Sequence, residues 1–193
     1  MARVKIFLFT CIQLAMTSGV AAQEARQAVD FTVYQKWQKF DPLDWEDFKG
    51  AKPDEYQGDA GSVVKIKAIP FIVKKKIQYK VYALFNRKKS WAQKRSSKLL
   101  KHEQLHFDIA ELYARKIRKK IAWLSNAGED DLKVYNREIE TLMQESNDFD
   151  RLYDAKTLHG ALLRQQLVWE EKVSRSLRDL EGFKEKKNII RRK

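Results

Sequence analysis

The chain has 193 residues, of which 44% are hydrophobic and 34% charged, and its excess of Lys and Arg over Asp and Glu gives a net charge of +13. This composition excludes an intrinsically disordered chain and is sufficient for one hydrophobic core, so we expect a single domain. The positive charge favours contact with an anionic surface or partner.

The first 22 residues have the pattern of a secretory signal peptide. Two basic residues precede a mostly apolar run, and Val20-Ala21-Ala22 supplies small residues for cleavage before Gln23. We therefore predict a secreted or periplasmic protein. The apolar run is shorter than the roughly 20 residues of a membrane span, so we expect no stable membrane insertion after cleavage, with a retained anchor as the alternative. Cys11, the single cysteine, lies in this segment, so the mature chain has no disulfide.

An acidic and aromatic motif, Leu43-Asp-Trp-Glu-Asp-Phe-Lys-Gly50, follows a weakly patterned lead-in. Asp44 is a typical helix cap, and Leu43 and Phe48 can pack inward, so we predict a short structural helix. The alternative is an aromatic loop that contacts a substrate.

Two stretches with alternating β-branched or aromatic residues and lysines, 63–69 and 77–85, predict a small antiparallel sheet at about residues 62–86. Pro70 cannot donate a backbone hydrogen bond, which favours an edge position for the first strand. Such an edge can accept an extended peptide. The alternative is an edge that its lysines protect from pairing.

Helical periodicity predicts three long helices: Ser90–Leu124, Glu129–Phe149, and a third that begins after a turn at 152–160 and ends near Gly182. We therefore predict an α+β fold in which the small sheet packs on a bundle of three helices. Residues 23–183 form the domain, and 184–193 form a basic C-terminal tail.

The first long helix contains His102-Glu103-Gln-Leu-His106. Residues four apart share one helix face, so the two imidazoles can bind one zinc ion, with Glu103 beside them. The same periodicity directs Glu111 and Arg115 to the opposite side and toward solvent, which argues against Glu111 as a ligand. The alternative is an ordinary core helix whose histidines find partners within the protein.

A third zinc ligand must come from elsewhere in the chain. His159 is the one remaining histidine, and we expect it to point inward at the start of the third helix. Three protein ligands with water in the fourth position are typical of a catalytic zinc. Asp154 is the alternative third ligand, and a core or capping role is the alternative for His159.

Three motifs together resemble those of a bacterial family of secreted zinc-dependent proteases, catalogued as a domain of unknown function. They are Leu43–Gly50, Leu100–Phe107, and Tyr153-Asp-Ala-Lys-Thr-Leu-His-Gly160 with Gln166 and Trp169. The resemblance spans nearly the whole mature chain. It implies a zincin-like metallopeptidase architecture and supports the metal site more than any particular substrate.

These observations favour a zinc metallopeptidase that hydrolyses a peptide or protein substrate. Glu103 is the expected general base, Tyr153 a candidate donor to the reacting carbonyl, and Asp154 a candidate partner of a ligand imidazole. The alternative is a non-catalytic envelope protein that keeps a structural zinc and uses its basic surface to bind an anionic polymer or protein. Nucleic acid is not expected, because export separates the chain from the genome and no recognition motif is present.

Overall fold

The computed structural model describes residues 29–56, 58–73 and 76–185. The predicted signal peptide, Cys11 and most of the basic tail lie outside these residues. The chain divides into two units after Asp30, and the unit that begins at Phe31 contains all of the elements described below.

The main sheet has three antiparallel strands in the order β1, β4, β3. The central strand β4 (Lys76–Asn86) pairs with β1 (Tyr34–Lys36) on one side and with β3 (Val64–Val73) on the other. A second pair joins β2 (Ala60–Gly61) to β5 (Trp91–Ala92). The prediction that Pro70 lies on an edge strand is confirmed, because β3 forms one side of the three-stranded sheet.

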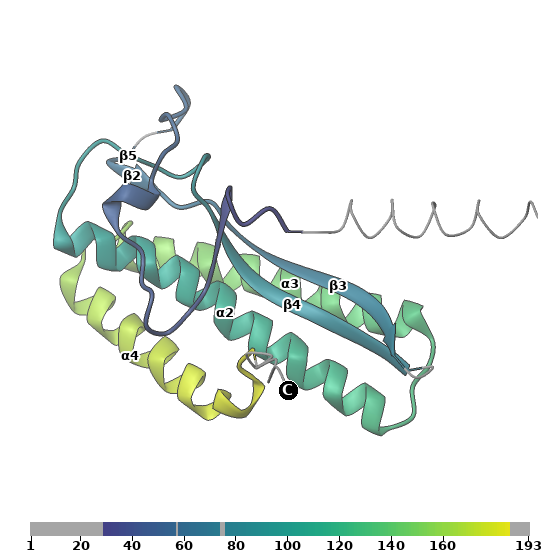
Figure 1. Cartoon of the computed structure of the whole chain (residues 1–193). Coiled ribbons are helices and arrows are strands. Elements are labelled where there is room, and N and C mark those ends of the chain that lie inside the picture. The colour runs from purple at the N-terminus through teal and green to yellow at the C-terminus, as the bar shows by residue number, and fades with distance from the viewer. Residues whose placement is uncertain (1–28, 57, 74–75, 186–193) are drawn as a thin grey trace, which may run out of the picture. The chain divides into compact units, whose positions relative to one another are not determined.

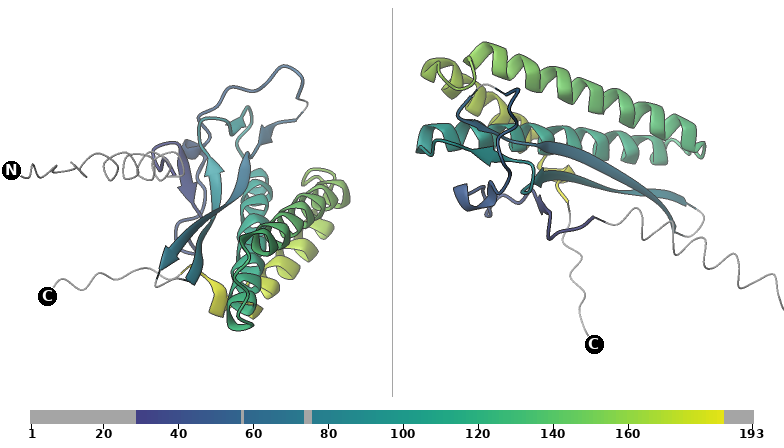
Figure 2. Two further views of the ribbon diagram at one scale, coloured as in Figure 1. Left: turned by 90° about the vertical axis from the view of Figure 1, so that its right-hand side faces the viewer. Right: turned by 90° about the horizontal axis from the view of Figure 1, so that it is seen from above.

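Three helices pack beside the sheet: α2 (Ser97–Asn126), α3 (Leu132–Thr157) and α4 (Leu163–Asp179), followed by the short helix η2 (Glu181–Phe183). Figures 1 and 2 show α2 between the sheet and the other two long helices. The predicted α+β fold, a small antiparallel sheet on three helices, is confirmed. Among the described helices, none is long and apolar enough to cross a bilayer.

Two predicted helix boundaries are wrong. α2 begins at Ser97 rather than Ser90, because Trp91 pairs with Gly61 and the Ser96 side chain caps the helix by accepting from the Leu99 N–H. α3 continues past Phe149 to Thr157, so most of the expected turn at 152–160 is helical. Tyr153 and Thr157 extend the buried face of α3, which explains the longer helix.

The motif at 43–50 forms the predicted short helix, and its apolar side chains pack inward as expected. The Asp44 side chain caps the short helix η1 (Trp45–Asp47) and takes part in a capping box. Leu43 and Phe48 are buried, and the ring centroids of Phe48 and Phe85 are 5.0 Å apart. The motif therefore covers the end of the core between the sheet and α2.

The expectation that Glu111 and Arg115 face solvent is wrong, because α2 is covered on opposite sides. Their side chains are 4% and 2% exposed and form an ion pair of 2.9 Å, and Arg118 Nη1 lies 2.9 Å from the same carboxylate. Arg115 also donates to Leu177 O at 2.7 Å, and Arg118 donates to Val81 O at 2.7 Å. This network connects α2 to α4 and to β4.

The network predicts a large effect of Arg115→Ala. Removing the guanidinium takes away one of the two charges that neutralise the buried Glu111 carboxylate, so we expect the free energy of unfolding to fall by about 3–5 kcal/mol. Urea denaturation followed by circular dichroism measures this change. Arg175→Ala is the matched control, since its ion pair with Glu171 is exposed and is worth less than about 1 kcal/mol. Equal losses in the two variants would contradict the structural role of Arg115.

Candidate metal centre

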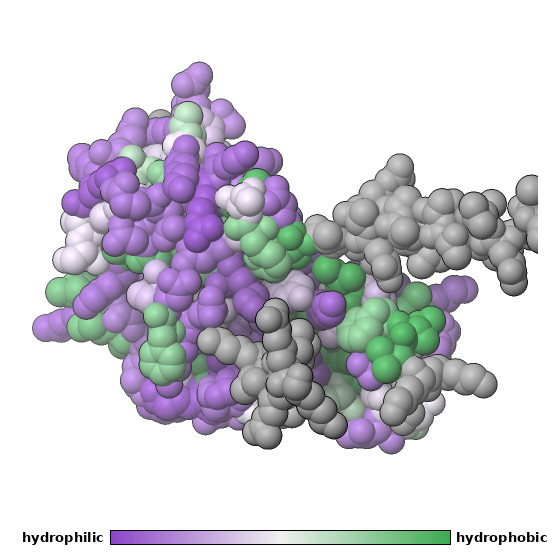
Figure 3. All heavy atoms as spheres, in the orientation of Figure 1, coloured by the Kyte–Doolittle hydropathy of each residue, from purple (hydrophilic) through white to green (hydrophobic). Residues whose placement is uncertain are grey.

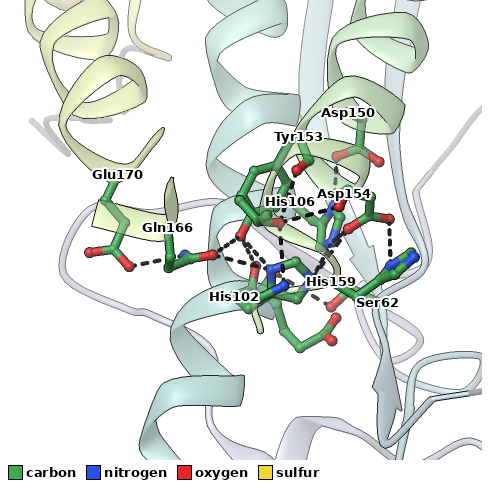
Figure 4. Close-up of polar contacts among 12 residues, drawn as sticks. Ser62, His102, His106, Asp150, Tyr153, Asp154, His159, Gln166 and Glu170 are labelled. Atoms are coloured by element: carbon green, nitrogen blue, oxygen red, sulfur yellow. Dashed lines mark hydrogen bonds and ion pairs between the residues drawn. The ribbon is translucent and has the colours of Figure 1, made fainter. Parts of the chain in front are cut away.

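The helix α2 places His102 and His106 on the side that faces α3 (Figure 4), and Glu103 follows His102 on the same helix. All three side chains are buried although each is polar or charged. They are positioned by the packing of α2, whose neighbouring residues Leu105, Ile109 and Tyr113 belong to the core shared with α3 and α4. The predicted inward orientation of the three motif residues is confirmed.

Asp154, from the last turns of α3, reaches the same point. Its Oδ1 atom lies 3.3 Å from His102 Nε2 and 3.2 Å from His106 Nε2, and the two Nε2 atoms are 3.3 Å apart. Zinc bonds of about 2.0–2.1 Å directed to the corners of a tetrahedron would hold their donor atoms about 3.3–3.4 Å apart. These three donor atoms therefore have the mutual spacing of ligands on one tetrahedral ion.

Two buried carboxylate oxygens support a cation at this position. Within the described structure, Asp154 Oδ1 and Glu103 Oε2 are buried and make no hydrogen bond, although Asp154 Oδ1 lies within ion-pair distance of both imidazoles. A buried anionic oxygen without a partner, as at Glu103, is costly, and a cation would remove that cost. Burial tends to raise the pKa of Asp154, but its contacts with His102 and His106 outweigh burial and hold the pKa well below its usual range.

The outer nitrogens of both imidazoles are held by neighbours. His106 Nδ1 donates to Asp150 Oδ1 at 2.7 Å, an arrangement that orients a metal-binding histidine and leaves Nε2 for the metal. Burial alone lowers the pKa of His106, but Asp150 and Asp154 outweigh it and raise the pKa to about 10.

His102 is oriented by a chain of hydrogen bonds toward α4. The Tyr153 hydroxyl lies 2.6 Å from His102 Nδ1 and donates to Gln166 Oε1 at 2.8 Å, and Gln166 Nε2 donates to Glu170 Oε1 at 3.0 Å. Tyr153 is fully buried, and burial raises its pKa well above the ordinary range. Tyr153 therefore contacts a histidine and is closed off from solvent. The sequence had suggested it as a donor to the reacting carbonyl, a role that requires access to a substrate.

His159 does not point inward, so that expectation is wrong. Its side chain is 79% exposed, and its Nδ1 lies 3.5 Å from Asp154 Oδ2. The chain leaves α3 through a turn in which Leu158, His159 and Gly160 all have positive φ. This turn directs the imidazole of His159 to the solvent-exposed rim of the candidate site. One donor atom each from His102, Asp154 and His159 nevertheless lie within 4.8 Å of one another, so His159 stays a candidate ligand.

Gly160 is required by the same turn. A Cβ atom at this position would lie 2.9 Å from Cγ of His102, closer than carbon atoms can approach. The backbone after α3 therefore packs directly on the imidazole of His102.

A cavity of about 240 Å³ begins at His106 and runs between the edge strand β3 and α3, with α2 as its floor. Its walls combine apolar and polar side chains from the three elements, namely Val64, Lys65, Ile66, His106, Ile109, Ala110, Met143, Ser146, Asn147 and Asp150. A ligand in this cavity would contact His106 and Asp150.

Reasoning from the sequence missed Asp150. This residue lies four positions before Asp154 on α3, so both carboxylates share one helix face and meet His106 from the same side. The spacing was visible in the sequence, but the predicted helix ended at Phe149 and hid it.

The comparisons with known proteins support a bacterial family without assigning an activity. No curated protein and no solved structure matches the chain significantly. Residues 70–160, which contain His102, Glu103, His106 and Asp154, match the model of a family described as "Bacterial protein of unknown function (DUF922)". Over these residues, the chain is similar to a bacterial domain of unknown function.

Proposed function

We propose that this protein is a zinc-dependent metallopeptidase whose ligands are His102, His106 and Asp154. The observation that carries the proposal is the triangle of their donor atoms, with sides of 3.2–3.3 Å, beside the buried carboxylate of Glu103. His159, the third ligand favoured by the sequence, takes a place at the rim of the site in this proposal. A secreted or periplasmic location follows from the signal-like N-terminus and is part of the same proposal.

Bound zinc would lower the pKa of a coordinated water to about 7 and polarise the carbonyl of the scissile bond. Glu103 is the general base: its carboxylate accepts a proton from the attacking water and passes it to the departing amine as the C–N bond breaks. Asp150 and Tyr153 keep the two imidazoles in position, so that each presents Nε2 toward Asp154.

A peptide substrate is favoured by the edge of β3 beside the cavity. The Asn86 N–H donates to Val63 O, so Val63 faces β4, and the alternation of a strand turns the backbone groups of Val64, Ile66 and Ala68 to the open side. An extended chain can pair with these groups and pass into the cavity that contains His106. Pro70, which lacks an N–H, would end the pairing.

The second candidate function is a structural zinc in a non-catalytic envelope protein. It is favoured by the closeness of His159 to Asp154, because a fourth protein ligand would close the coordination sphere. An accessible water in the zinc-loaded protein, detected by exchange with a small anion such as azide, would favour the peptidase.

The ligand assignment predicts opposite outcomes for two variants. Loss of a group that only orients a ligand typically lowers metal affinity by about 10-fold to 100-fold. Asp154→Asn removes a ligand, so it should lower zinc affinity by more than about 100-fold. His159→Ala should lower zinc affinity by less than about 10-fold. Titration of zinc against a competing chelator measures both affinities. A His159 variant that loses zinc while the Asp154 variant keeps it would make His159 the third ligand.

The role of Glu103 predicts that Glu103→Gln keeps zinc and loses turnover. The amide preserves the size of the side chain but cannot accept the proton, so hydrolysis of a pool of quenched fluorescent peptides should fall by about 100-fold to 10,000-fold. Zinc content, measured by mass spectrometry of the same sample, controls for the metal. Undiminished hydrolysis would exclude Glu103 as the base.

The contact between Asp150 and His106 predicts that Asp150→Asn lowers zinc affinity by about 10-fold to 100-fold. Asp148→Asn is the control on the same helix, because Asp148 is exposed and pairs with Arg151. If both variants bind zinc as tightly as the parent protein, Asp150 does not orient His106.

A further inference from the structure

An exposed apolar surface lies at the junction of α3 and α4. Leu158, Leu162, Leu163 and Leu167 are 57%, 43%, 57% and 54% exposed, and we call these four residues the leucine surface. Leu158 and Leu162 are in the turn between the helices, and Leu163 and Leu167 follow one helical turn apart on α4. Figure 3 shows hydrophobic side chains interrupting the hydrophilic surface on the left, where α2 and α4 begin.

The charges around the leucine surface are predominantly positive. No acidic residue occurs from Ala155 to Trp169, whereas Lys156 and Arg164 are present and exposed. The start of α2 adds Lys98 and Lys101, which line a shallow cavity of about 150 Å³ together with Leu163 and Leu167. Glu170 lines the same cavity, but its carboxylate accepts a hydrogen bond from Gln166.

The position of Leu158 is unfavourable in water for two reasons. Its backbone is left-handed, with φ of 47°, which is costly for a residue with a Cβ atom, and its apolar side chain is exposed. Hydrogen bonds on both sides of it fix the turn, from His159 N to Asp154 O and from Leu162 N to Thr157 O. A left-handed residue is common at a helix C-cap, but it is usually glycine, so an exposed leucine here points to a role for its side chain.

We propose that the leucine surface docks on a bilayer rich in anionic phospholipid. The four leucines would enter the boundary between headgroups and acyl chains, while Lys98, Lys101 and Arg164 contact lipid phosphates. A second copy of the chain is a poorer partner, because a two-fold contact through this surface would bring like charges together. Since His159 lies in the same turn, docking would hold the metal centre beside the membrane and favour substrates at its surface.

Binding to vesicles tests this proposal without any enzymatic activity. The zinc-loaded chain is mixed with vesicles of phosphatidylcholine alone or with added phosphatidylglycerol, and the bound fraction is measured by flotation. We expect binding that requires phosphatidylglycerol and weakens as salt rises. In Leu163→Ser/Leu167→Ser, binding should weaken by about 10-fold for each leucine. Ile72→Ser is the matched control, because Ile72 is 76% exposed on β3, away from the leucine surface.

Leu158→Gly separates docking from folding. Glycine adopts a positive φ freely, so this variant should keep the Tm and the zinc affinity of the parent but bind vesicles about 10-fold more weakly. Absence of binding to the mixed vesicles, equal binding by the parent and the double leucine variant, or loss of binding in Ile72→Ser alone would overturn the proposal. So would dimerisation in solution that the double variant abolishes, since the surface would then belong to a contact between copies. None of these outcomes bears on the chemistry of Glu103.

Discussion

The carboxylate of Asp154 lies between the imidazoles of His102 and His106, and much of the structure serves to keep it there. The contact joins two helices, α2 and α3, whose apolar faces pack on each other around it. Three polar groups at a buried point would destabilise the fold if they lacked compensating charge or hydrogen bonds. The histidines find outer partners in Asp150 and Tyr153, and among the described residues Glu103 Oε2 is buried without a hydrogen-bond partner.

The helix α2 can carry such a centre because it is surrounded by other elements. One side packs on the sheet and the other on α3 and α4 (Figure 2). Side chains on both sides of the helix are therefore buried. Away from the histidines, the buried Glu111 and Arg115 neutralise each other, and Arg115 also donates to the backbone carbonyl of Leu177 on α4. The helix is therefore fixed by ionic contacts at some distance from the metal centre as well as by its apolar core.

The turn after α3 both contacts His102 and exposes side chains to solvent. Gly160 permits the backbone to lie against His102, while the positive φ values of Leu158 and His159 turn those side chains outward. A histidine at the rim and leucines on the surface are consequences of the same backbone path. One short motif therefore contacts His102 on its inner side and exposes leucines on its outer side.

Features that depend on local periodicity could be predicted without a structure. Residues four apart on a helix share a face, so the inward pair His102 and His106 with Glu103 could be derived, as could the sheet with Pro70 at its edge. The capped motif at Asp44 was equally local. Three features could be seen only in the folded chain: the contact of Asp154 with the two histidines, the exposure of His159, and the burial of Glu111. These features depend on where α3 ends and on which elements cover each side of α2. Both are set by packing between segments far apart in the chain, which outweighs local helix propensity.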